Sequence, residues 1–349
     1  MNKIQGKVTS IIKYILPSVA TMVLYCLILF RKGIYPFGTE TIDYYDMAQQ
    51  IAAFYYHVYD SLHGGKAFFF DWYSALGTNM AMSTSGCSNI SLFNLFFLFI
   101  KRNRLLESLS VFNMIKMMSM SFTMYFYLHR RFRASYFYEL LLSIGYGFCG
   151  FVLVLYITNQ WMDIAVLFPL IVYFAGKAIS ERKWIGYLVT LSLALINSYY
   201  ITFMIFIYLF LIVGTFMLGE FIFAGKGNKK EAIKKYDLVP FGVATVFSML
   251  ISAFILMPQI YQTLSSARFK NENGEGLLAT YLGIISQVNG AYTTRWWSLL
   301  LLSLPAVIIL RGIIKHRKDK KSVFIVIFSI VVVTLELFLE SVNLIWHFG

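Results

Sequence analysis

The stretch "TETIDYYDMAQQIAAFYYHVYDSLHGGKAFFFDW", residues 39–72, concentrates residue types that serve acid–base and metal chemistry. A carboxylate can take a proton from an attacking hydroxyl group, and carboxylate oxygens are the ligands that hard divalent cations prefer. If the segment is helical, the three- and four-residue spacings put its first polar groups on one face. A solvated loop also needs acids, so composition alone leaves both interpretations open. Its acids and amides include Asp43, Asp46, Gln49, Gln50, Asp60 and Asp71.

The composition around this stretch is that of a membrane protein. Of 349 residues, 58% are hydrophobic and 13% are charged, whereas soluble domains contain about 25% charged residues. The net charge of +13 does not indicate nucleic-acid binding, because Lys and Arg of membrane proteins collect in cytoplasmic loops. We therefore expect membrane lipids, and no nucleic acid, among the partners.

The apolar runs predict an all-α polytopic membrane protein with about nine transmembrane helices in a single domain, residues 1–349. Runs of about 17 to 25 residues are long enough to cross the hydrocarbon core. Tight turns, "TNQWMD" (158–163) and "NSYY" (197–200), separate two pairs of runs. The first run is expected to remain as a span, because it is too long for a signal peptide. The predicted spans are 14–30, 107–127, 137–157, 163–179, 184–198, 200–223, 239–258, 296–314 and 322–345.

The first external loop, residues 31–106, is expected to contain helices that do not span. The residues that follow Asp46 have the pattern of an amphipathic helix, which can lie along the membrane interface. The apolar core of "NISLFNLFFLFIKRNR" (89–104) is too short to span, which predicts a re-entrant or interfacial helix. The basic end of this segment could face a lipid phosphate or cap the short helix.

The distribution of Lys and Arg predicts the orientation of the chain in the membrane. With the N-terminus in the cytoplasm, the cytoplasmic segments contain 20 Lys and Arg residues against 4 acids, as the positive-inside rule requires. The acid-rich loop then lies outside the cytoplasm. If residues 89–104 crossed the membrane, every later loop would be inverted and this bias would be reversed.

Further polar residues are predicted on the same external side. Lys116 lies within a predicted span, where an ionisable side chain is unfavourable unless it is paired or lies in a wet cavity. It could bind a lipid phosphate or form a structural ion pair with an acid. The residues of the external turns are Asn159, Trp161, Asp163, Asn197 and Tyr199.

Several stretches resemble the YfhO family of bacterial membrane proteins, which is grouped with the GT-C glycosyltransferases. "DMAQQIAAFYY", "LHGGKAFFFDWYSALGTNM" and "SNISLFNLFFLF" are similar to the family's first external segment, with Ser91 near a family proline. "NQWMDIAVLFPL", "INSYYITFM" and "NLIWHFG" resemble later motifs, and Lys116 matches a family lysine. The motifs are individually loose, but their order is that of the family. Family members are longer, so the resemblance implies an N-terminal fragment that lacks C-terminal spans and an external domain.

The resemblance implies a GT-C-like glycosyltransferase that uses a polyprenyl-phosphate sugar on the extracytoplasmic face of the bacterial plasma membrane. The acceptor would be a cell-envelope glycopolymer or glycolipid, such as teichoic acid. Asp46 is expected as the base with Asp43 as its alternate, while Gln50 and Gln49 orient the acceptor and Lys116 contacts the phosphate. The expected borders of the substrate site are Asn159, Trp161, Asp163 and Tyr199. No cofactor is indicated beyond a divalent cation such as Mg²⁺ or Mn²⁺ on Asp43 or Asp46.

Two other classes remain open. A transporter or flippase for a lipid-linked glycan would place its ionisable groups near the bilayer midplane, among interrupted helices. A non-enzymatic protein of envelope assembly would not require the acids at all. Neither the sugar nor the oligomeric state follows from the sequence.

Overall fold

The computed structural model describes residues 2–44, 46–65, 69–72, 77–79, 90–132, 134–224, 236–265, 312–315 and 317–338. Almost all of these residues are helical. The chain forms two compact units, which are described separately: unit 1 is Met1–Thr202 with Val239–Gln259, and unit 2 is Phe203–Leu238 with Ile260–Gly349.

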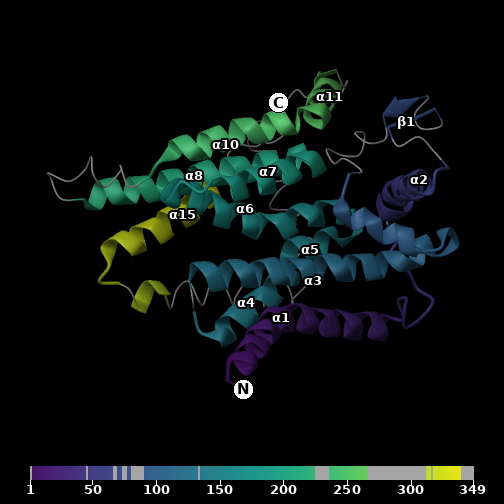
Figure 1. Ribbon diagram of the computed structural model, residues 1–349, viewed down its shortest axis with the longest axis horizontal. Helices are drawn as coiled ribbons and strands as arrows, with labels where there is room; N and C mark the ends of the chain where they lie inside the picture. Colours follow the sequence, from purple (N-terminus) through teal and green to yellow (C-terminus); the bar gives the residue numbers. More distant parts are fainter. Residues whose placement is uncertain are drawn as a thin grey trace. The chain divides into compact units, whose positions relative to one another are not determined.

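Unit 1 is a layered bundle of helices that contains the loop predicted to be external, residues 31–106. Along the bundle, α1 packs on α3, α3 on α4 and α6, and α6 on α7 (Figure 1). Ser248 of α10 and Ser252, which follows α10, donate hydrogen bonds to the Leu188 and Ser192 carbonyls of α7 at 3.1 and 3.2 Å. The long helices are α1 (Asn2–Lys32), α3 (Leu105–Arg131), α4 (Tyr136–Gly147), α6 (Met162–Glu181), α7 (Ile185–Asn197) and α10 (Leu238–Ile251).

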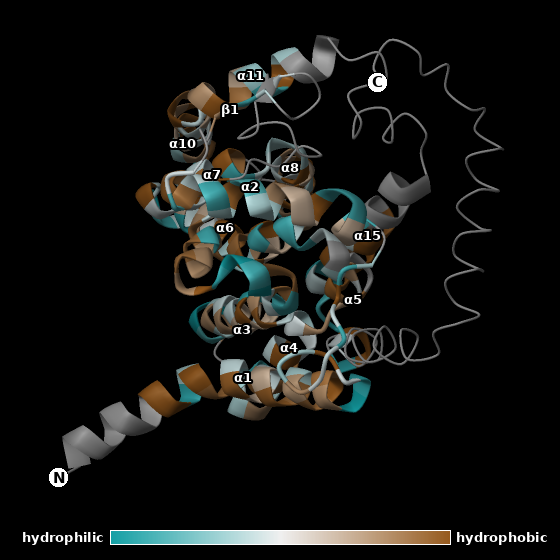
Figure 2. Ribbon diagram, turned by 90° about the vertical axis from the view of Figure 1, so that its right-hand side faces the viewer, coloured by the Kyte–Doolittle hydropathy of each residue, from teal (hydrophilic) through white to brown (hydrophobic). Residues whose placement is uncertain are grey.

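The central helix α3 is the most polar of the long helices. Its buried polar side chains face other helices. Thr21 of α1 and Ser121 of α3 share a hydrogen bond of 2.7 Å, and Ser18 donates to the Met118 carbonyl at 2.9 Å. On the outer side, α1 exposes large apolar residues such as Phe30 and Leu27, and it is coloured largely hydrophobic in Figure 2. Polar residues inside and apolar residues outside are the arrangement expected when the surroundings are lipid.

The described residues contain four helical segments that are long and apolar enough to cross a membrane, or five if one bent pair counts as a single span. These are Ile11–Lys32, Tyr136–Leu153, Thr158–Glu181, Tyr199–Phe223, and the bent pair Leu238–Ile251 with Ala253–Tyr261. The predicted second span lies in α3, and α7, at 13 residues, covers most of the fifth. The predicted eighth span falls largely, and the ninth partly, outside the described residues. An all-α membrane protein is thus confirmed, whereas the count of nine remains a prediction.

Two predicted spans contain breaks. The third is divided into α4, α5 (Gly150–Leu155) and the short 3₁₀ helix η4 (Tyr156–Trp161). The seventh bends by 74° between α10 and α11 (Ala253–Ser265). The two predicted turns are confirmed, since η4 precedes α6 and Ser198 separates α7 from α8 (Tyr199–Phe223).

The described residues of the loop predicted to be external, 31–106, contain short helices and one small hairpin. Its apolar core joins α2 to η2 and to the start of α3, through Met47, Ile51, Tyr55, Phe97 and Phe112 among others. The helices are η1 (Met47–Ile51, π-helical), α2 (Ala52–Leu62), η2 (Leu92–Phe99, 3₁₀) and η3 (Arg102–Arg104, 3₁₀). The hairpin pairs β1 (Phe70–Asp71) with β2 (Thr78–Asn79). The predicted amphipathic helix is therefore present, and the predicted short helix at 89–104 is two 3₁₀ segments.

Unit 2 contains most of α8 and also α15 (Lys320–Phe338). Lys321 pairs with Glu220 at 2.6 Å. A Cβ atom added at Gly219 would lie 2.7 Å from Ile325, so the glycine permits the close approach of these two helices.

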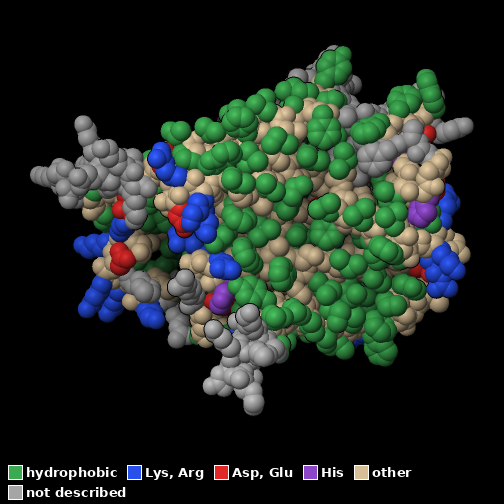
Figure 3. Space-filling model, viewed as in Figure 1, with side chains coloured by type: hydrophobic (Ala, Val, Ile, Leu, Met, Phe, Trp, Pro, Cys, Tyr) green, Lys and Arg blue, Asp and Glu red, His purple; other side chains and the backbone are tan. Residues whose placement is uncertain are grey.

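Charged side chains in unit 1 gather toward the two ends of α3. Hydrophobic side chains cover the part of unit 1 between these ends (Figure 3). Arg102 and Arg104 lie just before the helix, and Arg130 and Arg131 close it, all of them exposed. Basic residues flanking an apolar band are typical of a protein that crosses a bilayer.

Candidate functional site

A buried ion pair joins helices α3 and α6 of unit 1. Lys116 Nζ of α3 lies 2.6 Å from Asp163 Oδ1 of α6, and their side chains are 1% and 5% exposed. The Lys116 ammonium also lies 4.3 Å from the ring centroid of Phe112. A charge this far from solvent requires an opposite charge, so each member fixes the other.

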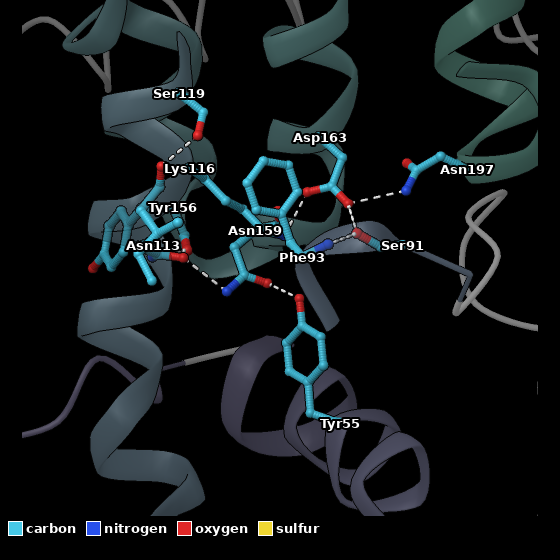
Figure 4. A network of polar contacts seen from close by, with 11 residues as sticks. Tyr55, Ser91, Phe93, Asn113, Lys116, Ser119, Tyr156, Asn159, Asp163 and Asn197 are labelled. Atoms are coloured by element: carbon cyan, nitrogen blue, oxygen red, sulfur yellow. Dashed lines mark hydrogen bonds and ion pairs between the residues drawn. The ribbon is translucent and has the colours of Figure 1, made fainter. Parts of the chain in front are cut away.

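Additional hydrogen bonds satisfy both members of the pair (Figure 4). Lys116 Nζ donates to the Asn159 carbonyl at 2.9 Å. Asp163 Oδ2 accepts from Asn197 Nδ2 at 3.0 Å and from the Ser91 hydroxyl. Because the pair on α3 and α6 is held by η4, α7 and the residue before η2, it ties five parts of unit 1 together.

A row of amide side chains extends from the ion pair to α2. Asn159 Nδ2 donates to Asn113 Oδ1 at 2.7 Å, and Asn113 Nδ2 donates to the Tyr156 carbonyl at 3.0 Å. Tyr55 of α2 donates its hydroxyl to Asn159 Oδ1 (Figure 4). We call the set Tyr55, Ser91, Asn113, Lys116, Asn159, Asp163 and Asn197 the polar network.

The network lies near one end of the helices. Asp163 is in the first turn of α6 and Asn197 is the last residue of α7. On α3, Ser110 donates to the Tyr35 carbonyl just beyond the end of α1, at 2.6 Å. At 1.5 Å per residue, Lys116 is about 9 Å further into the bundle than Ser110. The network is therefore one to two helical turns inside the level at which α1 ends.

The predicted face of acids and amides is present in part. Asp46, Gln49 and Gln50 are exposed on η1, while Met47 and Ile51 are buried beneath them. In a π-helical turn, residues separated by four or five positions lie next to each other. Asp46 makes no hydrogen bond or ion pair with any described residue, and η1 contacts η4, which holds Asn159.

Asp43 differs from this expectation. It precedes η1 in a non-helical segment, is half-buried and accepts a hydrogen bond from Thr41. The assumption that Asp43 and Asp46 share a helical face is wrong, because the helix begins only at Asp46. Asp43 is therefore engaged locally, whereas Asp46 is open to solvent.

Of the other predicted residues, Trp161 is half-buried at the end of η4, and Tyr199 is buried at the start of α8. Sequence reasoning assigned no role to Asn113, Ser91 or Tyr55. Asn113 is polar within an apolar span, one helical turn before Lys116, and this spacing is the signal that would have identified it. Ser91 precedes an apolar run as a helix cap does.

Two further acids of the loop, Asp60 and Asp71, have partners of their own. Asp60 accepts two hydrogen bonds from Arg102, at 2.7 and 3.1 Å, and this contact raises the pKa of the Arg102 guanidinium. Asp71 lies 3.6 Å from the buried His57. These two acids therefore stabilise the loop itself, unlike Asp46.

A metal centre requires several side-chain ligands that converge on one point. No three His, Cys, Asp or Glu side chains in this part of the chain converge to hold an ion. Asp43 accepts a hydrogen bond from Thr41 and Asp46 is exposed, and a divalent cation on either carboxylate stays a prediction.

A bundle of apolar helices with polar side chains turned inward defines an α-helical, polytopic membrane protein. The chain belongs to the family of the bacterial membrane protein YfhO, which matches residues 18–349. Comparison with curated proteins and with solved structures gives no match.

Proposed function

We propose that this protein is a membrane glycosyltransferase that transfers a sugar from a polyprenyl-phosphate donor to a cell-envelope acceptor on the extracytoplasmic side. The observation that carries the proposal is the solvent-exposed, unengaged Asp46 on a short helix that packs against the turn holding Asn159. A carboxylate without protein partners is available to accept a proton from a bound hydroxyl group. The proximity of the network to one end of the helices also favours this function over a midplane transport site.

In the proposed reaction, Asp46 accepts the proton of the acceptor hydroxyl as its oxygen attacks the anomeric carbon. The bond between that carbon and the phosphate oxygen breaks, and the polyprenyl phosphate leaves with the bonding electrons. Gln49 and Gln50 lie exposed beside Asp46 and are suited to orient the acceptor. A basic residue must stabilise the leaving phosphate.

Lys116 can take this role only if it exchanges Asp163 for the phosphate. At 1% exposure and 2.6 Å from Asp163, it is committed to the acid in the structure. The proposal therefore assigns Asp163 a positioning role, and Asn159, Trp161 and Tyr199 border the same site. A divalent cation at Asp43 or Asp46 remains a separate proposal, and no step above requires it.

The proposal is tested by assaying the protein in membranes with a panel of polyprenyl-phosphate sugars, with and without chelator. Asp46→Asn should reduce turnover by about 10²–10⁴-fold while donor binding is retained, because only the base is lost. Asp60→Asn, a matched carboxylate already held by Arg102, should cost far less. Equal activity of the parent and Asp46→Asn proteins would contradict the assignment of the base and favour the transport or assembly alternatives.

A further inference from the structure

The helix η2 turns a row of large apolar side chains outward. A 3₁₀ helix has three residues per turn, so residues three apart align on one face. Leu92, Leu95 and Leu98 follow this spacing and are 72%, 49% and 45% exposed, and Phe99 beside them is 84% exposed. We call these four residues the η2 stripe. A contiguous exposed apolar patch on a short helix marks an interaction surface.

Packing of the opposite face of η2 fixes the side toward which the η2 stripe points. Asn94 and Phe97 are buried. The Phe97 ring centroid lies 5.2 Å from that of Tyr55 and 5.0 Å from that of Phe112, on α2 and α3. Rotating η2 to hide the stripe would expose Phe97, so the outward leucines are a result of packing.

Basic side chains follow the stripe directly. Arg102 is held by Asp60 at 2.7 Å. Lys101 is exposed and makes no ion pair with a described residue, while Arg104 Nε lies 3.9 Å from Glu107, at the limit of an ion pair. Two exposed cations, Lys101 and Arg104, therefore stand at the end of an exposed apolar row.

We propose that the η2 stripe with Lys101 and Arg104 is a binding site for anionic phospholipid of the bilayer surface. The stripe lies among the upper acyl chains, and the two cations contact lipid phosphate. At about 2 Å per residue, the eight residues of η2 extend about 16 Å, too short for a hydrocarbon core of about 30 Å, so the helix lies along the interface. The site is independent of the glycosyltransferase proposal.

Bound lipid at this site acts on the polar network through Ser91. The Ser91 hydroxyl accepts the Phe93 backbone N–H at 3.1 Å and so caps η2. The same hydroxyl donates to Asp163. The position of η2 in the interface therefore sets the position of one partner of the buried ion pair.

The test measures which lipid lies at the stripe. Cys26, Cys87 and Cys149 are replaced by alanine, Leu95→Cys is labelled with a fluorophore, and the protein is placed in nanodiscs of phosphatidylcholine and phosphatidylglycerol. Either lipid is brominated in turn, so that quenching reports its contact with the label. Each basic residue near a membrane surface adds about a fivefold preference for anionic lipid, so brominated phosphatidylglycerol should quench more strongly.

Lys101→Gln with Arg104→Gln should abolish this preference. Arg130→Gln with Arg131→Gln removes the same charge at the other end of α3 and should leave it unchanged. A label at Phe99→Cys repeats the measurement if the first position perturbs η2. Equal quenching by both lipids, quenching by neither, or loss of the preference when polyprenyl phosphate is added would overturn the proposal.

Discussion

At the scale of residues, the buried Lys116–Asp163 pair is expected to contribute strongly to stability. Removing one partner of a buried ion pair costs about 3–5 kcal/mol, because the other charge remains buried. Lys116→Met and Asp163→Asn should each lower the thermal unfolding temperature in detergent. The double variant should be less destabilised than the sum of the two, since it leaves no unpaired charge.

An exposed pair provides the control for this experiment. Lys183 lies 2.9 Å from Glu181 with both side chains exposed, and such pairs contribute about 1 kcal/mol or less. Lys183→Met should therefore unfold close to the parent protein. If Lys116→Met instead remains as stable as the parent but loses donor binding, Lys116 serves the phosphate and the structural role is refuted.

At the scale of elements, η2 depends on one aromatic side chain. Phe97 is fully buried between α2 and α3, whereas Phe99, two residues on, is 84% exposed. Phe97→Ala should destabilise the protein by about 3–5 kcal/mol through the cavity it leaves. Phe99→Ala should stay within about 0.5 kcal/mol, measured by thermal unfolding in detergent. Equal losses for both variants would mean that η2 is not anchored by its inner face.

The packing of α4 on α1 and α3 depends on a glycine. A Cβ atom at Gly147 would lie 2.4 Å from Ser121 Oγ and 3.2 Å from Thr21 Cγ2, while one at Gly145 would meet nothing within 4 Å. Gly147→Ala should destabilise by about 1–3 kcal/mol, because Ser121 and Thr21 must separate. Gly145→Ala should be neutral or stabilise by up to about 1 kcal/mol through helix propensity.

This comparison is read from the unfolding temperatures of the two alanine variants. Both glycines lie in α4, so a change in general helix flexibility would affect the two variants alike. A difference between them therefore reports the close approach of Gly147 to Ser121 and Thr21. A Gly147→Ala protein that unfolds at or above the temperature of Gly145→Ala would contradict the close packing of α4.

At the scale of the whole molecule, orientation is the prediction with the widest consequences. The 20 Lys and Arg residues of the predicted cytoplasmic segments predict that the acid-rich loop lies outside the cytoplasm. In a cysteine-free background, an impermeant thiol reagent added to sealed cells should label His63→Cys in that loop. Ser180→Cys at the end of α6, which is also exposed, should be labelled only after permeabilisation.

The reverse labelling pattern would invert the topology. The proposed site would then face the cytoplasm, where soluble nucleotide sugars would replace lipid-linked donors. Detergent-solubilised protein serves as the control, because both cysteines should react once the membrane is removed.

The sequence by itself determined the class of the protein and the positions of most helices. Apolar run length alone identifies helices such as α1, α6 and α8, because a bilayer requires about twenty apolar residues. Ordered motifs also led to the family that the comparison confirms. Local turns at 158–163 and at Ser198 were readable because polar residues interrupt apolar runs.

Only the tertiary structure decided which polar residues meet. Lys116 and Asp163 are 47 positions apart in the sequence, and nothing in their spacing distinguishes an acid partner from a lipid phosphate. Helix packing brings three further residues into the polar network, Asn113, Ser91 and Tyr55. The helix start at Asp46, which separates this acid from Asp43, depends on burying Met47 and Ile51 against the loop core. Long-range contacts of this kind depend on how elements pack, and local sequence patterns do not record that packing.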